Sequence, residues 1–260
     1  NKNPLAILDE DNDLELPSTY DLIRMIDRAA EDTAVKGIYL KCESNANGVG
    51  TSQEIRNALE SFRKSGKFII AYADAIEQNA YFVANVSTRV YCNPKGGMDW
   101  RGYSMTYLFL KGALDRLGIE PQIFYAGKFK SATEPFRETK MTEANRIQST
   151  ALMEDLYAHF LQLTAASRKL DTATLRRYAE ENTIRTATDA WKAGLVDGLK
   201  YDDEVKAEIR EGAVLGKNAR INFVTLGQYL KSMEDGKMSR DKVAVSYAQG
   251  HIVDGKGNED

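Results

Sequence analysis

Four short runs of apolar, β-branched and aromatic residues recur along the first half of the chain. Each run is nearly continuous rather than alternating, which is typical of strands buried on both faces of a parallel sheet. The runs are Gly37–Cys42, Phe68–Ala73, Arg89–Cys92 and Pro121–Ala126. The pattern predicts a strand at each.

Between and after these runs, apolar residues recur at the spacing of one helix face. Segment 17–32 begins with Ser18 or Thr19 as a cap, and segment 51–67 begins with a Thr51–Glu54 capping box and ends at Gly66. Further helices are predicted at 103–117, Thr142–Lys169, Thr172–Glu181 and Thr188–Ala193. The alternation predicts an α/β fold with a mostly parallel sheet, flanking helices and a helical C-terminal part.

The last 18 residues start a new pattern. A charged, glycine-containing segment is followed by the apolar run VAVSYAQGHIVDG within Val243–Asp260. It resembles the first strand of a further unit, which predicts a main domain at 1–235 and, at 236–260, a linker with the opening strand of a second domain. The alternative is an edge strand that completes the first sheet.

Composition narrows the function classes. The 260 residues include 35 Lys or Arg and 38 Asp or Glu, giving a net charge of −3 without a basic stripe, so nucleic acid is not an expected partner. Cys42 and Cys92 each end an apolar run, and we expect both to be small buried core residues. No cysteine or histidine spacing predicts a metal site or a cofactor, and no apolar run approaches about 18 residues, the length of a membrane span.

The candidate chemistry lies in GKFKSATEPF, Gly127–Phe136. Only two histidines occur, His159 within a predicted helix and His251 in the tail, so a general base must come from Asp, Glu or Lys. A lysine that acts as a base must be neutral, which requires a buried, apolar site because its reference pKa is about 10.4. Lys130 follows an apolar run, but Ser131 is a poor nucleophile for it because adjacent side chains do not face each other.

This segment resembles the lysine motif of the signal peptide peptidase A family, also called protease IV. Three further segments support the resemblance by their order and spacing: Leu40–Leu59, a strand, a turn and a helix; Tyr72–Ala84, the nucleophile segment; and Thr186–Leu199, a late helix that ends in G-L-V-D. The resemblance covers nearly the whole chain and implies a crotonase/ClpP-like fold. It also implies that Lys130 is the general base.

Two other positions depart from the family pattern. The nucleophile segment typically reads D-x-A-A-S-G-G-Y, and here the serine position holds Gln78. The paired glycines near the oxyanion hole are replaced by Ala46 and Asn47. The long form of the family, built from two tandem copies, divides its site in this way: the first copy supplies the lysine and the second supplies the serine. The resemblance therefore identifies this chain as the N-terminal half.

The resemblance implies a serine endopeptidase with a Ser-Lys dyad that degrades released signal peptides, whereas the isolated half is expected to be inactive. Expected partners are the peptide substrate, the C-terminal half and further copies in a homotetramer. An upstream anchor would hold the catalytic part on the periplasmic side of the bacterial inner membrane. The alternatives are a crotonase-class acyl-CoA enzyme, a non-catalytic oligomerisation scaffold, and Lys128 as the base.

Overall fold

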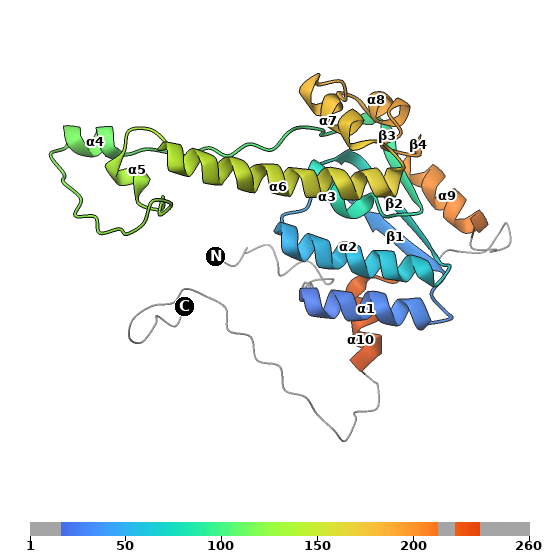
Figure 1. The fold of residues 1–260 in the computed structure, drawn as a ribbon. Helices are drawn as coiled ribbons and strands as arrows, with labels where there is room; N and C mark the ends of the chain where they lie inside the picture. The colour runs from blue at the N-terminus through green and yellow to red at the C-terminus, as the bar shows by residue number, and fades with distance from the viewer. Residues whose placement is uncertain (1–16, 213–221, 235–260) are drawn as a thin grey trace. The chain divides into compact units, whose positions relative to one another are not determined.

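The computed structural model describes residues 17–212 and 222–234, and the chain divides into two compact units. The larger unit, Leu16–Phe223, contains the sheet and all the described helices but one (Figure 1). The other unit is described only at 224–234, where α10 (Leu226–Glu234) forms. The predicted second domain at 236–260 lies outside the described residues, and its boundary stays a prediction.

The larger unit is built on a parallel sheet. Its four strands are β1 (Gly37–Lys41), β2 (Phe68–Ile76), β3 (Arg89–Met98) and β4 (Gly198–Leu199), and they lie in the order β1-β2-β3-β4. Every neighbouring pair is parallel, with Gly37 opposite Phe68 and Ile70 opposite Arg89. Three of the predicted strands are confirmed, as is the α/β class with its parallel sheet and flanking helices.

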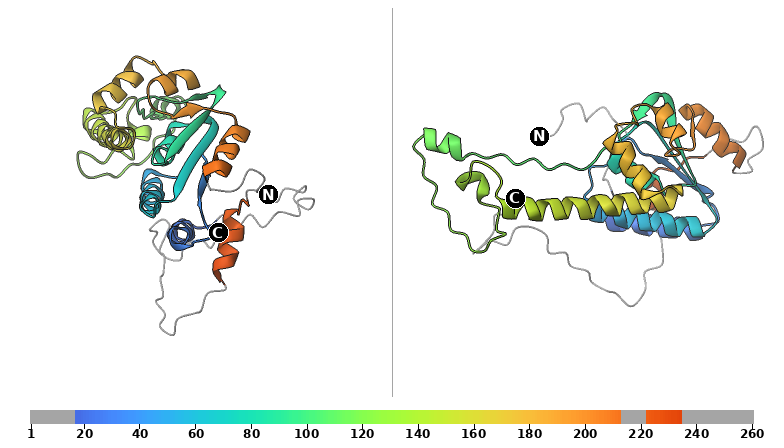
Figure 2. Two further views of the ribbon diagram at one scale, coloured as in Figure 1. Left: turned by 90° about the vertical axis from the view of Figure 1, so that its right-hand side faces the viewer. Right: turned by 45° about the horizontal axis from the view of Figure 1, so that its top comes forward.

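Both faces of the sheet are covered, which explains the continuous apolar runs. On one face, Ile70, Tyr72 and Tyr91 pack against Val205 and Ile209 of α9 (Asp202–Gly212). Figure 2 shows α2 (Val49–Lys64) and α6 (Glu143–Arg168) on the opposite side of the sheet from α9. The intervening strand residues are completely buried: Ile69, Ala71 and Ala73.

The pairing of β2 with β3 is interrupted by a bulge. Ala73 lies opposite Cys92, but Ala75 lies opposite Gly97, so β3 has extra residues at this point. A Cβ atom at Gly96 would lie 1.6 Å from the carbonyl oxygen of Asp74. Only glycine allows the two backbones to approach this closely, and the bulge directs the end of β3 past the start of α3 (Gln78–Ala84).

The first two helices form largely as their sequences predict. Helix α1 (Thr19–Glu31) begins where the Ser18 side chain accepts a hydrogen bond from the Asp21 backbone N–H. Helix α2 begins at Val49 with Gly48 as its N-cap, so the predicted Thr51–Glu54 capping box is wrong: Thr51 already lies within the first turn.

The three predicted later helices are confirmed as α6, α7 (Thr172–Glu180) and α8 (Ala187–Lys192). Helix α6 has 26 residues and is about 39 Å long at 1.5 Å per residue. Its C-terminal half packs on the sheet unit through Phe160, which contacts Trp100 at a ring-centroid distance of 5.3 Å. Its N-terminal half extends beyond the sheet (Figure 1).

Residues 101–141, here called the arm, connect β3 to α6. The arm runs along α6 to the N-terminal end of that helix and returns, with two short helices, α4 (Lys111–Arg116) and α5 (Glu134–Arg137) (Figure 1). Within the described residues it contributes no strand, so the strand predicted at Pro121–Ala126 is wrong. A strand needs a neighbour to satisfy its backbone groups, and this segment has none in the sheet.

The helix predicted at 103–117 is also wrong over most of its length, because only Lys111–Arg116 is helical. The preceding residues are held in a non-helical path by their side chains. The ring of Tyr103 packs on Tyr157 of α6 at 5.2 Å, and the Tyr107 hydroxyl lies 2.9 Å from the Ser149 hydroxyl. These tertiary contacts along α6 override the local helical spacing.

Candidate active site

Lys130 lies in an exposed turn on the returning limb of the arm. Its backbone N–H donates to the Gly127 carbonyl at 3.3 Å, and Gly127 has a φ of +99°, a conformation that favours glycine. Helix α5 begins four residues later, with Pro135 in its first turn. The turn therefore has a defined backbone, with the Lys130 side chain at the surface.

The segment that carries Lys130 has several exposed apolar side chains. Phe124 is 91% exposed, and Tyr125, Phe129 and Phe136 are each about half exposed. Leu108 on the outgoing limb is 73% exposed. Exposed apolar side chains that gather on one segment are a feature of surfaces that bind another polypeptide.

Gln78 occupies the position where the family pattern has serine, and here it is structural. It is the first residue of α3, and its side-chain oxygen accepts a hydrogen bond from the Arg101 backbone N–H at 2.7 Å. Arg101 is the first residue of the arm. Gln78 thus fixes the point at which the arm leaves the sheet.

The segment with Ala46 and Asn47 is not arranged as an oxyanion hole. Among the described non-glycine residues only Lys169 and Asn182 have positive φ, so neither Ala46 nor Asn47 adopts the conformation that glycine favours. The backbone N–H of Asn47 donates to the side chain of Asn45, so it is not free to bind an oxyanion.

The structure does not bring Lys130 and Gln78 together. The Lys130 turn leads into α5, which is joined to the N-terminal end of α6 through Asn145, whereas α3 packs on α6 through Phe82 and Phe160. Asn145 and Phe160 are about 22 Å apart along the helix axis at 1.5 Å per residue. Lys130 therefore has no partner nucleophile at the position that the family pattern assigns.

The remaining candidate groups have structural roles. Cys42 and Cys92 are free, buried thiols, as expected, and burial raises the pKa of Cys42 to about 12 and that of Cys92 to about 11. His159 lies on α6 and contacts Gln53 and the Phe82 ring, whereas His251 lies outside the described residues. The described parts of the chain contain no cluster of metal-ligating side chains and no helix long and apolar enough to span a membrane.

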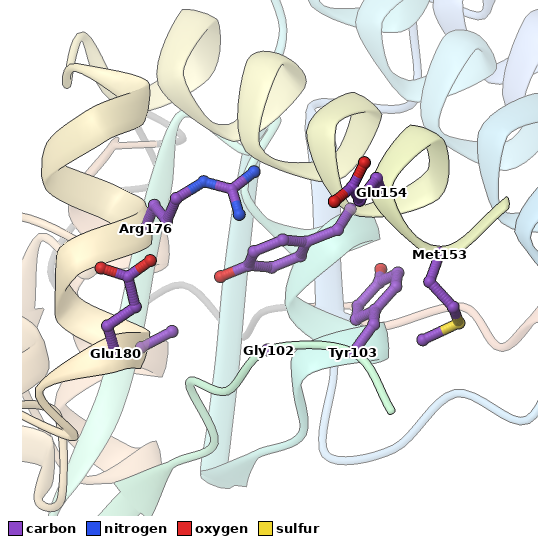
Figure 3. A pocket seen from close by; sticks show the side chains of 8 residues that line it. Gly102, Tyr103, Met153, Glu154, Arg176 and Glu180 are labelled. Atoms are coloured by element: carbon purple, nitrogen blue, oxygen red, sulfur yellow. The ribbon is translucent and has the colours of Figure 1, made fainter. Parts of the chain in front are cut away.

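A separate pocket of ≈ 270 Å³ lies between α6, α7 and the start of the arm (Figure 3). Arg176 lies over the ring of Tyr157, with its guanidinium carbon 5.1 Å from the ring centroid. Tyr103 and Met153 supply further apolar lining, and Glu154 and Glu180 supply carboxylates. The pocket contains none of the residues predicted from the sequence, so it is not joined to the Lys130 site.

One important residue of the site was missed by the sequence analysis. Glu134 is only 2% exposed, and its carboxylate accepts hydrogen bonds from Thr142 and Asn145 at the start of α6. Burial alone raises the pKa of Glu134, but these hydrogen bonds together with nearby Arg137 outweigh it and hold the pKa below its usual value. An acidic residue before proline at a helix start was the available sequence signal.

The sequence profile of Peptidase family S49 matches residues 61–216, which is more than half of the chain and includes both Gln78 and Lys130. The chain belongs to Peptidase family S49. The match favours a peptidase over the crotonase-class alternative.

Relatives of this S49 chain carry protease names. The chloroplastic serine protease SPPA of Arabidopsis thaliana is 28% identical over 237 residues, covering 88% of this chain and 34% of that protein. Protease 4 of Haemophilus influenzae is 26% identical over 254 residues, covering 94% and 41%. The S49 chain thus spans well under half the length of either relative.

One solved structure with a similar chain also carries a protease name. A mutant of the 1510-N membrane-bound stomatin-specific protease shares 12% identity with the S49 chain, covering 74% of this chain and 78% of that chain, with a TM-score of 0.43. A likeness at this level carries no argument about function.

Restoring the family's serine at Gln78 is expected not to create a peptidase. The Gln78→Ser variant should lose about 1 kcal/mol of stability with the hydrogen bond to Arg101, and Lys130 is not positioned to activate its hydroxyl. Treatment of the 260-residue chain with a fluorophosphonate, followed by intact mass measurement, should show no adduct. An adduct that disappears when Lys130→Ala is added would contradict the separation of the two positions.

Proposed function

We propose that this chain is the lysine-bearing half of a serine endopeptidase of the Ser-Lys type. Lys130 acts as the general base, and the nucleophilic serine belongs to the C-terminal half of the same protein. Neutral Lys130 takes the proton from the serine hydroxyl as that oxygen attacks the peptide carbonyl, and it then returns the proton to the leaving amine. The oxyanion hole comes mainly from the other half.

The observation that carries the proposal is the contrast between the two positions. Lys130 is held on a defined turn at the surface, whereas Gln78 lacks a hydroxyl and is engaged by Arg101. The exposed aromatic side chains in the segment that carries Lys130 support a polypeptide partner at this surface. Docking of such a partner would bury the lysine, and burial favours the neutral form that a base requires.

Substrate and assembly follow from the family resemblance. The substrates are released signal peptides, which are apolar and bind in extended form by strand addition to a sheet edge. The assembly is a homotetramer held by an upstream anchor, with its catalytic part on the periplasmic side of the bacterial inner membrane. The lengths of the relatives support a second half, since each is more than twice as long as the aligned region.

Serine-directed labelling tests the division of the site. After fluorophosphonate treatment of the full-length protein, peptide mapping should find the modified serine outside the 260 residues of this chain. The isolated chain should be neither labelled nor able to cleave an apolar signal peptide. A modified serine within the 260 residues, or cleavage by the isolated chain, would refute the proposal.

A further inference from the structure

Glu134 is a buried carboxylate at the start of α5, where most neighbouring residues are partly buried. One of its oxygens accepts from the Thr142 hydroxyl at 2.5 Å, and the other accepts from the Asn145 side-chain amide at 2.8 Å and the Thr142 backbone N–H at 3.3 Å. Arg137 adds an ion pair at 3.6 Å. Four donor groups thus converge on one carboxylate, whereas a simple surface ion pair involves a single donor side chain.

The hydrogen bonds continue from Glu134 through α6 to the other limb of the arm. The Asn145 side-chain oxygen accepts from the Ser149 hydroxyl at 3.0 Å, and Ser149 lies 2.9 Å from the Tyr107 hydroxyl. Asn145 and Ser149 are both buried. The two limbs are also joined directly, since the Leu110 backbone N–H donates to the Pro135 carbonyl at 2.6 Å. The network ties both limbs to the same helix.

The Lys130 turn is coupled to this network through the backbone. The Glu134 N–H donates to the Ser131 carbonyl at 2.9 Å, and the Lys130 N–H closes the preceding turn on Gly127. From Gly127 to Glu134 the chain is therefore two consecutive hydrogen-bonded turns. Their side-chain anchor to α6 is the Glu134 carboxylate, which accepts from Thr142 and Asn145.

We infer that Glu134 is a positioning residue that fixes the Lys130 turn to the N-terminal end of α6. The inference rests on the proposed function, in which Lys130 must meet a serine carried by another half. A base acts only within hydrogen-bond reach of its proton, and a displacement of about 1 Å can cost about 10²-fold in rate. By fixing the turn to α6, Glu134 would hold Lys130 at its working position before the partner half docks.

The chemistry of the anchor requires a carboxylate. Ionised Glu134 offers two acceptor oxygens to Thr142 and Asn145. A glutamine offers one oxygen and points its NH₂ group at a donor, which leaves buried groups unpaired.

The test is Glu134→Gln in the full-length protein, assayed by peptide cleavage. Because Glu134 is buried and acts through the position of the Lys130 turn, kcat should fall by about 10²-fold while KM stays unchanged. Glu138→Gln is the matched control. Glu138 pairs with the same Arg137, but its side chain is 39% exposed and lies outside the network, so the kcat of this variant should equal that of the unmodified protein. The double variant Glu134→Gln, Asn145→Asp exchanges amide and carboxylate across the pair and should recover most of the lost kcat.

A second measurement does not depend on activity. Amide hydrogen exchange at Lys130 and Glu134 should accelerate in Glu134→Gln and not in Glu138→Gln, with α2 unchanged in both. Unchanged kcat for Glu134→Gln, in a protein that Lys130→Ala inactivates, overturns the inference. If Lys130→Ala leaves cleavage intact, the proposed function fails instead, and the exchange rates alone decide whether Glu134 anchors the turn.

Discussion

Replacing Lys130 with alanine is expected to reduce peptide cleavage by the full-length protein by about 10²–10⁴-fold, the usual contribution of a general base. The reason is that no described side chain near the turn can replace it: Lys128, two residues away, places its ammonium over the Phe129 ring at 5.7 Å. Stability should not change, because the Lys130 side chain is exposed and takes part in no ion pair among the described residues.

Lys128→Ala is the matched control for this experiment. It removes the same charge from the same turn and should keep cleavage within about two-fold, since a surface charge contributes little. The measurement is kcat/KM with an apolar signal peptide, alongside thermal unfolding of each variant. If the Lys130→Ala variant cleaves normally, Lys130 is not the base, and the scaffold alternative for this chain is favoured. If only Lys128→Ala is inactive, the base is Lys128.

Replacing Arg56 with alanine is expected to cost about 3–5 kcal/mol of unfolding free energy, the largest stability effect that we predict. Arg56 is 1% exposed and joins three helices. From α2 it donates to the Phe82 carbonyl at 2.7 Å and the Asn85 side chain at 2.5 Å, and to the Leu163 carbonyl and Ser167 hydroxyl of α6. Its loss leaves buried acceptors unpaired and a cavity between α2, α3 and α6.

Arg63→Ala on the same helix is the control. Arg63 is exposed and makes one hydrogen bond, to the Val86 carbonyl at 2.7 Å, so its loss should cost about 1 kcal/mol or less. Urea unfolding of the chain, followed by circular dichroism, measures both. Equal losses for the two variants would show that Arg56 does not join the three helices as the contacts indicate.

The sequence predicted the sheet unit better than the arm. Strands β2 and β3 have continuous buried runs, Ile69–Ala73 and Val90–Cys92, which match their unbroken apolar sequences, and β1 is partly buried. The predicted helix at Thr142–Lys169 has Thr142 and Lys169 as its caps, as observed for α6. The arm was predicted wrongly because its apolar residues do not face a core. Phe124 looks like a strand residue in PQIFYA but is 91% exposed.

In the candidate site, too, the sequence predicted some features and missed others. The motif GKFKSATEPF predicted Lys130 as the base, which stays a prediction, and the absence of a serine at Gln78 was evident from the sequence. The contact of Gln78 with Arg101 and the burial of Glu134 were not, because each depends on residues brought together by folding. Spacing alone does not distinguish a buried, fully bonded carboxylate from a solvated one.

The sequence by itself determined the α/β class, the peptidase family and the residue types at positions 78 and 130. These features depend on local periodicity and on short motifs, which need no knowledge of the folded structure. Only the tertiary structure decided where those positions lie. Helix α6 is long, and it separates the Lys130 turn at one end from α3 nearer the other, about 22 Å along its axis. Lys130 therefore lies away from Gln78, at the surface, in a segment that carries exposed aromatic side chains.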